Sequence, residues 1–411
     1  MSARAAGLLL ALVLGAAALR LPGLGYPAEE YFDEVYHAKT AQQYLRGEPP
    51  TEWVHPPTAK LLIAGGVAVF GYEPWAWRLA PALAGTLLAP VFFLLARRVT
   101  PTERAALLAT ALLLMDGVYL VQSRIAMTNV FAVFFQLLAA LFVVAATETE
   151  RLRPWHMLGA GIALGLALST RWTSLFAWGF LGLVFLAVRG RRTLRPRELA
   201  FGALAFLVLP AGVYLLSYVP WMRQGHSVWD VLRTQRDIWS YHANLTAPHT
   251  YFSPWWTWPA LKRPTWYFWF SGEGFVRGIV ALGNPAIWWA AVPVSVWALA
   301  TGIRWRDPRR IFCGAGFFLL YLPWGLSPRT LNFSHYLFEA IPYACLSLGI
   351  WLDRRWDEGQ AILARGYVVV VAALFLLFLP FLTAIPVPTA LWGFSIPLLG
   401  GGIWRWFPTW V

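Results

Sequence analysis

The stretch YFDEVYHAK, residues 31–39, follows the first apolar segment of the chain. It places two adjacent carboxylates, Asp33 and Glu34, just past the end of that segment. A second polar stretch, WVHPPTAK at residues 53–60, follows in the same connection. Most of the remaining sequence is apolar, so we expect a membrane scaffold that holds these polar groups at one face of a bilayer.

The composition is typical of a helical membrane protein. Of the 411 residues, 58% are hydrophobic and 13% are charged, whereas a soluble domain has about twice that charged fraction. The formal net charge is +13, but the basic residues lie in short clusters between apolar runs. That pattern fits orientation signals and lipid headgroups better than nucleic acid. No Walker-type or GxGxxG phosphate loop is present in the sequence, which disfavours a nucleotide-binding domain.

Apolar windows that approach the ~20 residues needed to cross a bilayer occur along the whole chain. There are eleven: 6–22, 76–96, 105–121, 127–147, 157–172, 173–188, 199–219, 284–303, 311–326, 335–352 and 361–384. They predict one all-α membrane domain, residues 1–411, with about 11 transmembrane helices. Ten or twelve spans are the alternative if a short pair is misassigned. The first window resembles a signal peptide, but we interpret it as an uncleaved span.

The connections between the windows are of two kinds. One set is short and arginine-rich; with Arg4 it holds 18 of the 33 basic residues, and the positive-inside rule places it in the cytoplasm. The other set includes two long outer connections, residues 23–75 and 220–275. The N-terminus, with Arg4, is then cytoplasmic, and an odd number of spans leaves the C-terminus outside. Aromatic residues suited to an interfacial anchor end the chain: Trp404, Trp406, Phe407 and Trp410.

The two adjacent carboxylates suggest sugar transfer to a hydroxyl group. That reaction needs a carboxylate that accepts the hydroxyl proton, and cations that stabilise charge on a departing phosphate. Asp33 and Glu34 supply carboxylates, and their proximity predicts a raised pKa for one of them unless a cation lies between them. The structural alternative is a helix over residues 33–46 with Asp33 as its N-cap and Gly47 just past its end. Glu34 is then a solvated loop residue.

Several charged residues lie in or beside apolar runs, where charge is costly without a partner. Arg78 starts the second window, and its alternative role is to extend into lipid headgroups. Arg124 and Arg171 lie at outer turns, where each either binds a phosphate or simply ends a span. Asp116 is expected to pair with one of these arginines. Glu339 is either a functional acid or half of a buried structural pair.

His55 precedes two prolines, which fix an extended backbone. It is therefore held in a defined position, from which it orients a carboxylate or a phosphate; the alternative is a solvent-exposed histidine in a turn. Asp33, Glu34, His37 and His55 are the residues that a metal site would use. No recognised ligand spacing supports such a site, so we expect no metal and no cofactor.

Taken together and in order, the motifs resemble the protein O-mannosyltransferases, most closely the compact bacterial members. The resemblance covers nearly the whole chain. It rests on FDEV at 32–35, VHPPTAKL at 54–61, WRL at 77–79, Asp116-Gly117, SRIA at 123–126, YHANL at 241–245, LGNPAIWW at 282–289, His335-Tyr336 and WFPTWV at 406–411.

This resemblance implies a GT-C-type membrane fold, a polyprenyl-phosphate-mannose donor, and a Ser or Thr acceptor on an exported protein. It implies inverting, metal-independent transfer at the extracytoplasmic face of the cell membrane. Asp33 matches the catalytic acidic position, Glu34 its neighbour in catalysis or peptide binding, and Arg78 an arginine that supports the site. The other candidate donor-phosphate or substrate-binding residues are His55, Lys60, Arg124, Arg171, His335 and Tyr336.

Two departures from the family pattern stand out. Asn129 occupies the position where the motif that begins at Arg124 usually ends in Asp, so we expect a missing charge near Arg124. The large soluble module of eukaryotic members is absent, because only residues 220–275 are available for it.

Two rival functions remain open. An aminoarabinose transferase acting on lipid A has a similar fold and acidic motif, but usually carries Lys where His55 stands. A lipid or ion transporter, the non-enzymatic rival, predicts charges along a pathway through the bundle, whereas here they gather at one face.

Overall fold

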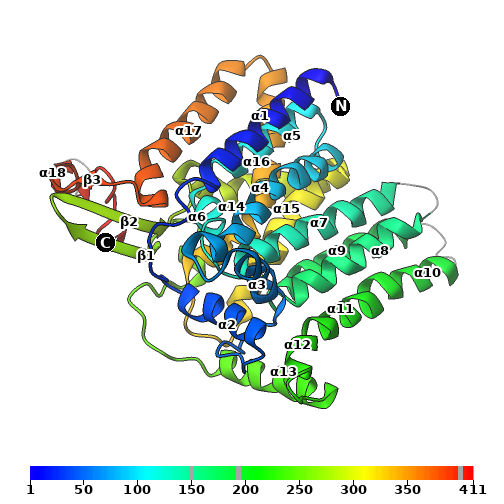
Figure 1. The fold of residues 1–411 in the computed structure, drawn as a ribbon. Helices are drawn as coiled ribbons and strands as arrows, with labels where there is room; N and C mark the ends of the chain where they lie inside the picture. The colour runs from blue at the N-terminus through cyan, green and yellow to red at the C-terminus, as the bar shows by residue number, and fades with distance from the viewer. Residues whose placement is uncertain (149–151, 191–195, 397–400, 411) are drawn as a thin grey trace.

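The computed structural model describes residues 1–148, 152–190, 196–396 and 401–410. It is mostly helical, and its long helices lie side by side in one bundle (Figure 1). The helices of the bundle are α1 (Ala3–Arg20), α4 (Pro74–Val99), α5 (Glu103–Leu114), α6 (Gly117–Gln122), α7 (Asn129–Glu148), α8 (Pro154–Leu168), α9 (Ser174–Arg189), α10 (Pro196–Ala203), the π-helical turn η1 (Leu204–Val208), α11 (Leu209–Ser217), α14 (Pro285–Trp305), α15 (Pro308–Tyr321), α16 (Ile341–Asp357) and α17 (Ala361–Thr383).

Six helical segments in the described part of the chain are long and apolar enough to cross a membrane. They are α1, α4, α7, α14, α17 and the continuous segment Pro196–Ser217. Within their most apolar windows, 78% of the α7 residues are buried, against 17% in α1 and 22% in α17. The outer helices therefore present apolar side chains outward, as a lipid-facing surface requires. The chain is a multi-pass membrane protein.

Each predicted apolar window contains a helix, but the window 105–121 holds two. Asp116 separates α5 from α6, and its Oδ1 accepts a hydrogen bond from Tyr119 N at 3.0 Å. Its Oδ2 accepts from Asn284 N at 3.0 Å and from Trp288 Nε1 at 2.7 Å, at the start of α14. The prediction that Asp116 pairs with an arginine is therefore wrong: backbone and indole N–H groups satisfy this carboxylate.

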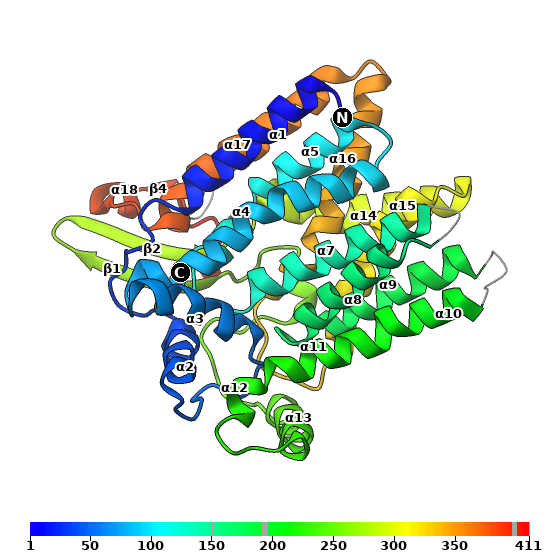
Figure 2. The ribbon, with the colours of Figure 1, turned by 45° about the vertical axis from the view of Figure 1, so that its right-hand side comes forward.

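The two long connections fold into short helices at one end of the bundle. The first forms α2 (Glu34–Arg46) and α3 (Thr58–Phe70), and the second forms α12 (Val219–Met222) and α13 (Val228–Ala243). Both views place these helices away from the N-terminus (Figures 1 and 2). Gly47 ends α2 with φ 68°, which confirms the predicted helix and its C-terminal glycine.

A three-stranded antiparallel sheet packs against α17 and α6 and departs from the all-α prediction. It consists of β1 (Thr265–Gly272), β2 (Phe275–Ala281) and β3 (Val387–Pro388). The β1 sequence TWYFWFSG is rich in aromatic residues, which favour strands. A short second ladder pairs β4 (Ser395–Ile396) with β5 (Gly401–Gly402).

The C-terminal aromatic residues pack onto this sheet. Trp266 Nε1 donates to the carbonyl of Trp410 at 2.9 Å, and Trp410 Nε1 donates to the carbonyl of Leu261 at 2.6 Å. Trp410 is buried. The interfacial-anchor prediction is therefore wrong for Trp410, whose indole fills a protein interior.

Candidate functional site

Asp33 lies directly before α2, at the N-cap position, but its side chain makes no capping hydrogen bond. Its carboxylate has no hydrogen-bond or ion-pair partner among the described residues. The preceding residue, Phe32, has φ 52°, a left-handed conformation that is strained for a bulky side chain. Stacking of Phe32 on Tyr267, with ring centroids 4.2 Å apart, supports that conformation. A helix cap therefore does not account for Asp33.

The side chain of Glu34, unlike that of Asp33, forms a buried ion pair with Arg78. Arg78 Nε donates to Glu34 Oε1 at 2.8 Å, and Nη2 donates to Oε2 at 2.7 Å. Ala126 N also donates to Oε1, at 2.9 Å. Glu34 is thus a buried, fully bonded side chain, and the alternative of a solvated loop residue is wrong.

Arg78 uses its remaining donors on the backbone of the first connection. Its Nη1 donates to the carbonyls of Leu24 at 2.8 Å and Pro27 at 2.6 Å, and its Nη2 donates to Glu29 O at 3.0 Å. A guanidinium has five N–H groups, and all five are used. Arg78 therefore fixes the chain that leads to Asp33 and has no donor left for a ligand.

A second buried carboxylate, Glu52, organises the neighbouring stretch. Glu52 Oε1 accepts from His55 Nδ1 at 2.7 Å, and Oε2 accepts from Lys60 Nζ. Lys60 also donates to the carbonyls of Glu52 at 2.9 Å and His55 at 2.7 Å, which uses its three N–H groups. The sequence reasoning missed Glu52; its spacing of three residues from His55 was the available signal.

Burial sets the protonation of the groups around Asp33. Burial raises the pKa of Asp33 to about 6, the nearby charge of Glu52 adds to the rise, and Arg171 and Arg329 oppose it. Burial lowers the pKa of His55 to about 4, although Glu52 favours its charged form. At neutral pH His55 is therefore uncharged, with its proton on Nδ1 toward Glu52 and Nε2 left as an acceptor.

Arg171 reaches the same site from the connection between α8 and α9. Its Nη1 donates to Asn129 Oδ1, its Nε lies 3.7 Å from Glu339 Oε1, and its guanidinium carbon is 4.7 Å from the ring centroid of Tyr336. Asn129 therefore faces Arg171, and the expectation of a missing charge beside Arg124 is wrong. Glu339 accepts from Gln136 Nε2 at 3.0 Å, so it belongs to a buried structural pair.

Arg329 is a further cation that the sequence reasoning missed. Its Nη1 lies 3.0 Å from His242 Nδ1, and its Nε donates to Leu331 O at 2.7 Å. It has no carboxylate partner among the residues that the structure describes. It lies in an irregular connection after α15, where no periodic pattern could mark it.

His335 and Tyr336 belong to one aromatic cluster with Phe32 and Phe333. The His335 ring stacks on Phe333 with centroids 5.4 Å apart, and it meets the edge of Phe32 at 6.3 Å. Tyr336 contacts the guanidinium groups of both Arg171 and Arg329. Tyr336 thus lies between Arg171 and Arg329, whose charges act on Asp33, and His335 contacts Phe32, the residue before Asp33.

Arg124 lies apart from this group. Its Nη1 donates to the carbonyls of Leu19, Arg20 and Pro22 at 2.8–2.9 Å, where α1 ends. Tyr31 OH bonds the carbonyl of Arg124 at 3.4 Å. These contacts hold the chain where it leaves the first helix.

Family comparisons cover almost the entire chain. A model described as dolichyl-phosphate-mannose-protein mannosyltransferase matches residues 10–77 and 73–222. A second model, described as the C-terminal four TMM region of protein-O-mannosyltransferase, matches residues 227–410. Together they span both long connections and the sheet.

Individual proteins agree with these models. The polyprenol-phosphate-mannose–protein mannosyltransferase of Corynebacterium glutamicum is 30% identical, over 87% of this chain and 81% of the relative. The enzyme of the same name from Mycolicibacterium smegmatis is 28% identical, over 96% and 91%.

Solved structures share the fold. The Saccharomyces cerevisiae Pmt1–Pmt2 complex bound to the sugar donor superposes with a TM-score of 0.82 at 15% identity, over 93% of this chain and 91% of that one. ArnT from Cupriavidus metallidurans bound to undecaprenyl phosphate gives 0.60 at 19% identity, over 91% and 70%. From the matched models and the relatives, the chain belongs to the protein O-mannosyltransferase family.

Proposed function

We propose that this enzyme transfers mannose from a polyprenyl-phosphate-mannose to Ser or Thr hydroxyls of exported polypeptides. The family assignment and the names of the bacterial relatives support the reaction class. The observation that carries the proposal is Asp33, a partly buried carboxylate with no partner among the described residues, beside two arginines.

Asp33 acts as the general base. A pKa of about 6 leaves most of this carboxylate ionised at neutral pH while keeping it more basic than an ordinary aspartate. It accepts the proton of the acceptor hydroxyl as the oxygen attacks the anomeric carbon. The lipid phosphate leaves from the opposite face of the sugar, so the configuration at that carbon is inverted.

Arg329 and Arg171 stabilise the charge on the leaving phosphate. Arg329 is the stronger candidate, because its contacts are a neutral histidine and a backbone carbonyl. Arg171 shares its charge with Glu339, at 3.7 Å. His335 and Tyr336 line the same space and orient the sugar or the phosphate.

The predicted ligand contacts of Arg78 and Lys60 are replaced by positioning roles, because all their N–H groups are used within the protein. Arg78 and Glu34 fix the chain before Asp33. Lys60 and Glu52 hold His55, whose free Nε2 accepts a hydrogen bond from a substrate hydroxyl. Arg124 secures the segment after α1.

We further propose that the helices of the bundle, from α1 to α17, cross the cell membrane eleven times, and that the short helices of the two long connections do not cross it. The arginine-rich connections are then cytoplasmic, with the N-terminus, and Asp33 faces the exterior. Cysteine labelling at Thr51, an exposed residue of the first connection, tests this sidedness. Labelling from the cytoplasmic side alone contradicts it.

The reaction is tested with membranes, labelled polyprenyl-phosphate-mannose and a Ser/Thr peptide. Wild type transfers label to the peptide, and Asp33→Asn loses about 10²–10⁴-fold in rate, the usual contribution of a general base. No transfer by wild type, or equal transfer by Asp33→Asn, contradicts the proposal. Competition between the mannose donor and an aminoarabinose-phosphate lipid tests the aminoarabinose transferase alternative. Lipid flux in reconstituted vesicles without any covalent product would favour the transporter alternative.

A further inference from the structure

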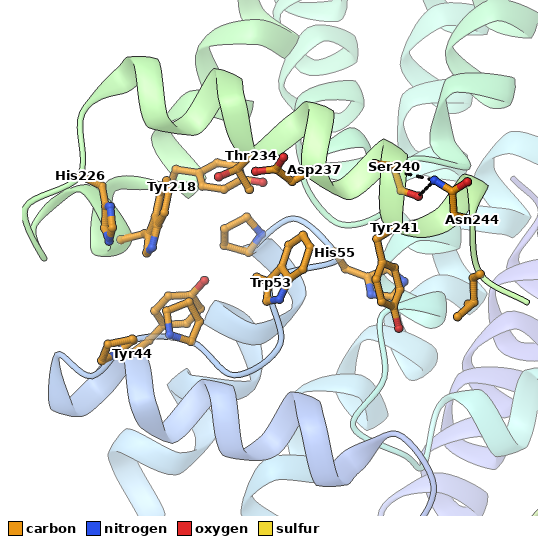
Figure 3. A pocket seen from close by; sticks show the side chains of 15 residues that line it. Tyr44, Trp53, His55, Tyr218, His226, Thr234, Asp237, Ser240, Tyr241 and Asn244 are labelled. Carbon is orange, nitrogen blue, oxygen red and sulfur yellow. Dashed lines mark hydrogen bonds between the residues drawn. The ribbon is translucent and has the colours of Figure 1, made fainter. Parts of the chain in front are cut away.

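A cleft of about 940 Å³ opens between the first connection and α13. Side chains of Tyr44, Trp53 and His55 point into it from one side, and side chains of α12, α13 and the adjoining chain face them from the other (Figure 3). We call it the α13 cleft. Trp53 and Tyr241 meet across it edge to face, with ring centroids 5.8 Å apart.

The α13 cleft is not built for a phosphate. The chain carries a formal charge of +13, yet none of the fifteen described residues that line the cleft is Lys or Arg. The one carboxylate among them is Asp237, and its other polar side chains include Thr234, Ser240 and Asn244. Aromatic faces, neutral hydrogen-bonding groups and a single negative charge suit a neutral or basic polypeptide segment.

The cleft is continuous with the proposed site. His55 lines it and also bonds Glu52 at 2.7 Å. The His55 ring lies 5.4 Å from that of His242, which contacts Arg329. A segment bound in the cleft therefore runs toward the histidines and arginines next to Asp33.

A hydrogen-bonded wall separates the α13 cleft from a smaller, mostly apolar groove of about 500 Å³ between α8, α9 and α11. In this wall Trp172 Nε1 donates to Tyr214 OH at 3.0 Å, Tyr214 bonds Gln235 at 2.5 Å, and Gln235 Nε2 donates to Tyr218 OH at 3.3 Å. The apolar groove fits a hydrocarbon chain, which leaves the polar cleft for the other substrate.

We propose that the α13 cleft binds the acceptor polypeptide, and that Asp237 makes the enzyme prefer acceptors with a basic residue near the modified Ser or Thr. This inference rests on the proposed function. Trp53 and Tyr241 hold the segment by contact with its side chains, and Asp237 adds a long-range attraction at the rim of the cleft.

One matched pair of variants tests the binding role. Trp53→Ala removes a ring that lines the cleft, whereas Trp229→Ala removes one that is 71% exposed on α13 and does not line it. We expect the KM for the peptide to rise about fivefold in Trp53→Ala and to stay unchanged in Trp229→Ala. The KM for the lipid donor stays unchanged in both.

Charge reversal tests the preference. With peptides that carry Lys or Glu beside a single Thr, Asp237→Lys raises the KM of the Lys peptide by about two- to fivefold and lowers that of the Glu peptide. Glu73→Lys is the control, because Glu73 is exposed at the start of α4 and does not line the cleft. It leaves the ratio of the two KM values at its wild-type value.

A direct binding measurement distinguishes failure of the cleft assignment from failure of the proposed mannose transfer. The affinity of a fluorescent Lys peptide for the purified protein is measured by anisotropy without donor. If wild type binds the peptide and Trp53→Ala weakens binding, the cleft assignment holds even when no mannose is transferred. If wild type transfers mannose but Trp53→Ala and Asp237→Lys leave the peptide KM unchanged, or change the donor KM instead, the assignment is wrong.

Discussion

Glu34 and Arg78 are joined by two hydrogen bonds of 2.8 and 2.7 Å in a fully buried setting. The adjacent residue, Asp33, has no such partner among the described residues. Two neighbouring carboxylates therefore have opposite environments: Glu34 is paired with a cation inside the protein, and Asp33 is left without a partner, as the proposed general base requires. The division follows from the start of α2, where consecutive side chains point in different directions.

The first prediction concerns the stability that this pair provides. Arg78→Met leaves Glu34 buried without its cation, a loss that costs about 3–5 kcal/mol. The midpoint of thermal unfolding in detergent should fall sharply. Arg354→Met breaks the exposed Arg354–Glu358 pair and should change it little. An unchanged midpoint in Arg78→Met, together with a raised donor KM, would make Arg78 a ligand of the donor.

The second prediction is an acidic limit on transfer set by Asp33. Its carboxyl has a pKa of about 6 in the folded protein against an ordinary value of 3.8, so lowering the pH through about 6 protonates the proposed base. The rate kcat/KM should fall tenfold for each pH unit below that point. A profile flat down to pH ~4.5 would contradict the assignment.

The same shift predicts a gain in stability when Asp33 is neutralised. A carboxyl whose pKa is raised by folding disfavours the folded state once it ionises, so its cost is full above pH ~6, declines as the pH falls from that value, and is gone below the ordinary pKa of 3.8. Asp33→Asn should therefore unfold at a higher temperature than wild type at pH 8, and the difference should shrink at pH 5. A lower midpoint at pH 8 would show that Asp33 is a structural residue.

The third prediction assigns the donor phosphate to Arg329. Arg329→Gln should lower kcat/KM for the lipid donor by about 10²-fold or more, as loss of one preorganised donor to a developing charge does. It should also move the acidic limit to higher pH, because Arg329 lowers the pKa of Asp33. Arg223→Gln, at an exposed residue after α12, is the matched control. Equal behaviour of the two variants would exclude Arg329 from the site.

Local sequence signals predicted much of the architecture. The length of the apolar windows located the helices of the bundle. Asp33 as the predicted start signal and Gly47 as the predicted stop signal gave the limits of α2. The hairpin of β1 and β2 was missed because residues 220–275 were predicted as a long outer connection with no strand in it, although a run such as TWYFWF favours a strand.

Partners distant in sequence were harder to predict. Asp116 is bonded by residues of α14, and Asn129 is bonded by Arg171, 42 positions away. Nothing in the spacing of these residues distinguishes one buried arginine from another. Glu52 was overlooked because its role depends on the return of Lys60 to the same point in space.

The fourth prediction uses that pair to test the electrostatics of the site. Glu52→Gln alone leaves Lys60 buried without its carboxylate, so the informative variant is Glu52→Gln combined with Lys60→Met. The double variant leaves the net charge unchanged, but it removes Glu52, whose nearby charge raises the pKa of Asp33, together with Lys60, which is not among the charges that shift that pKa. The acidic limit of kcat/KM should therefore move to lower pH, opposite to the shift in Arg329→Gln.

A matched charge change elsewhere separates this local effect from a general one. Arg354→Met combined with Glu358→Gln likewise removes one ion pair and leaves the net charge unchanged, and it should leave the acidic limit where it is in wild type. If both double variants shift the limit equally, the effect is not local to Glu52. If neither shifts it while Arg329→Gln does, Glu52 is screened from Asp33, and the cations alone set the basicity of the carboxylate that receives the proton.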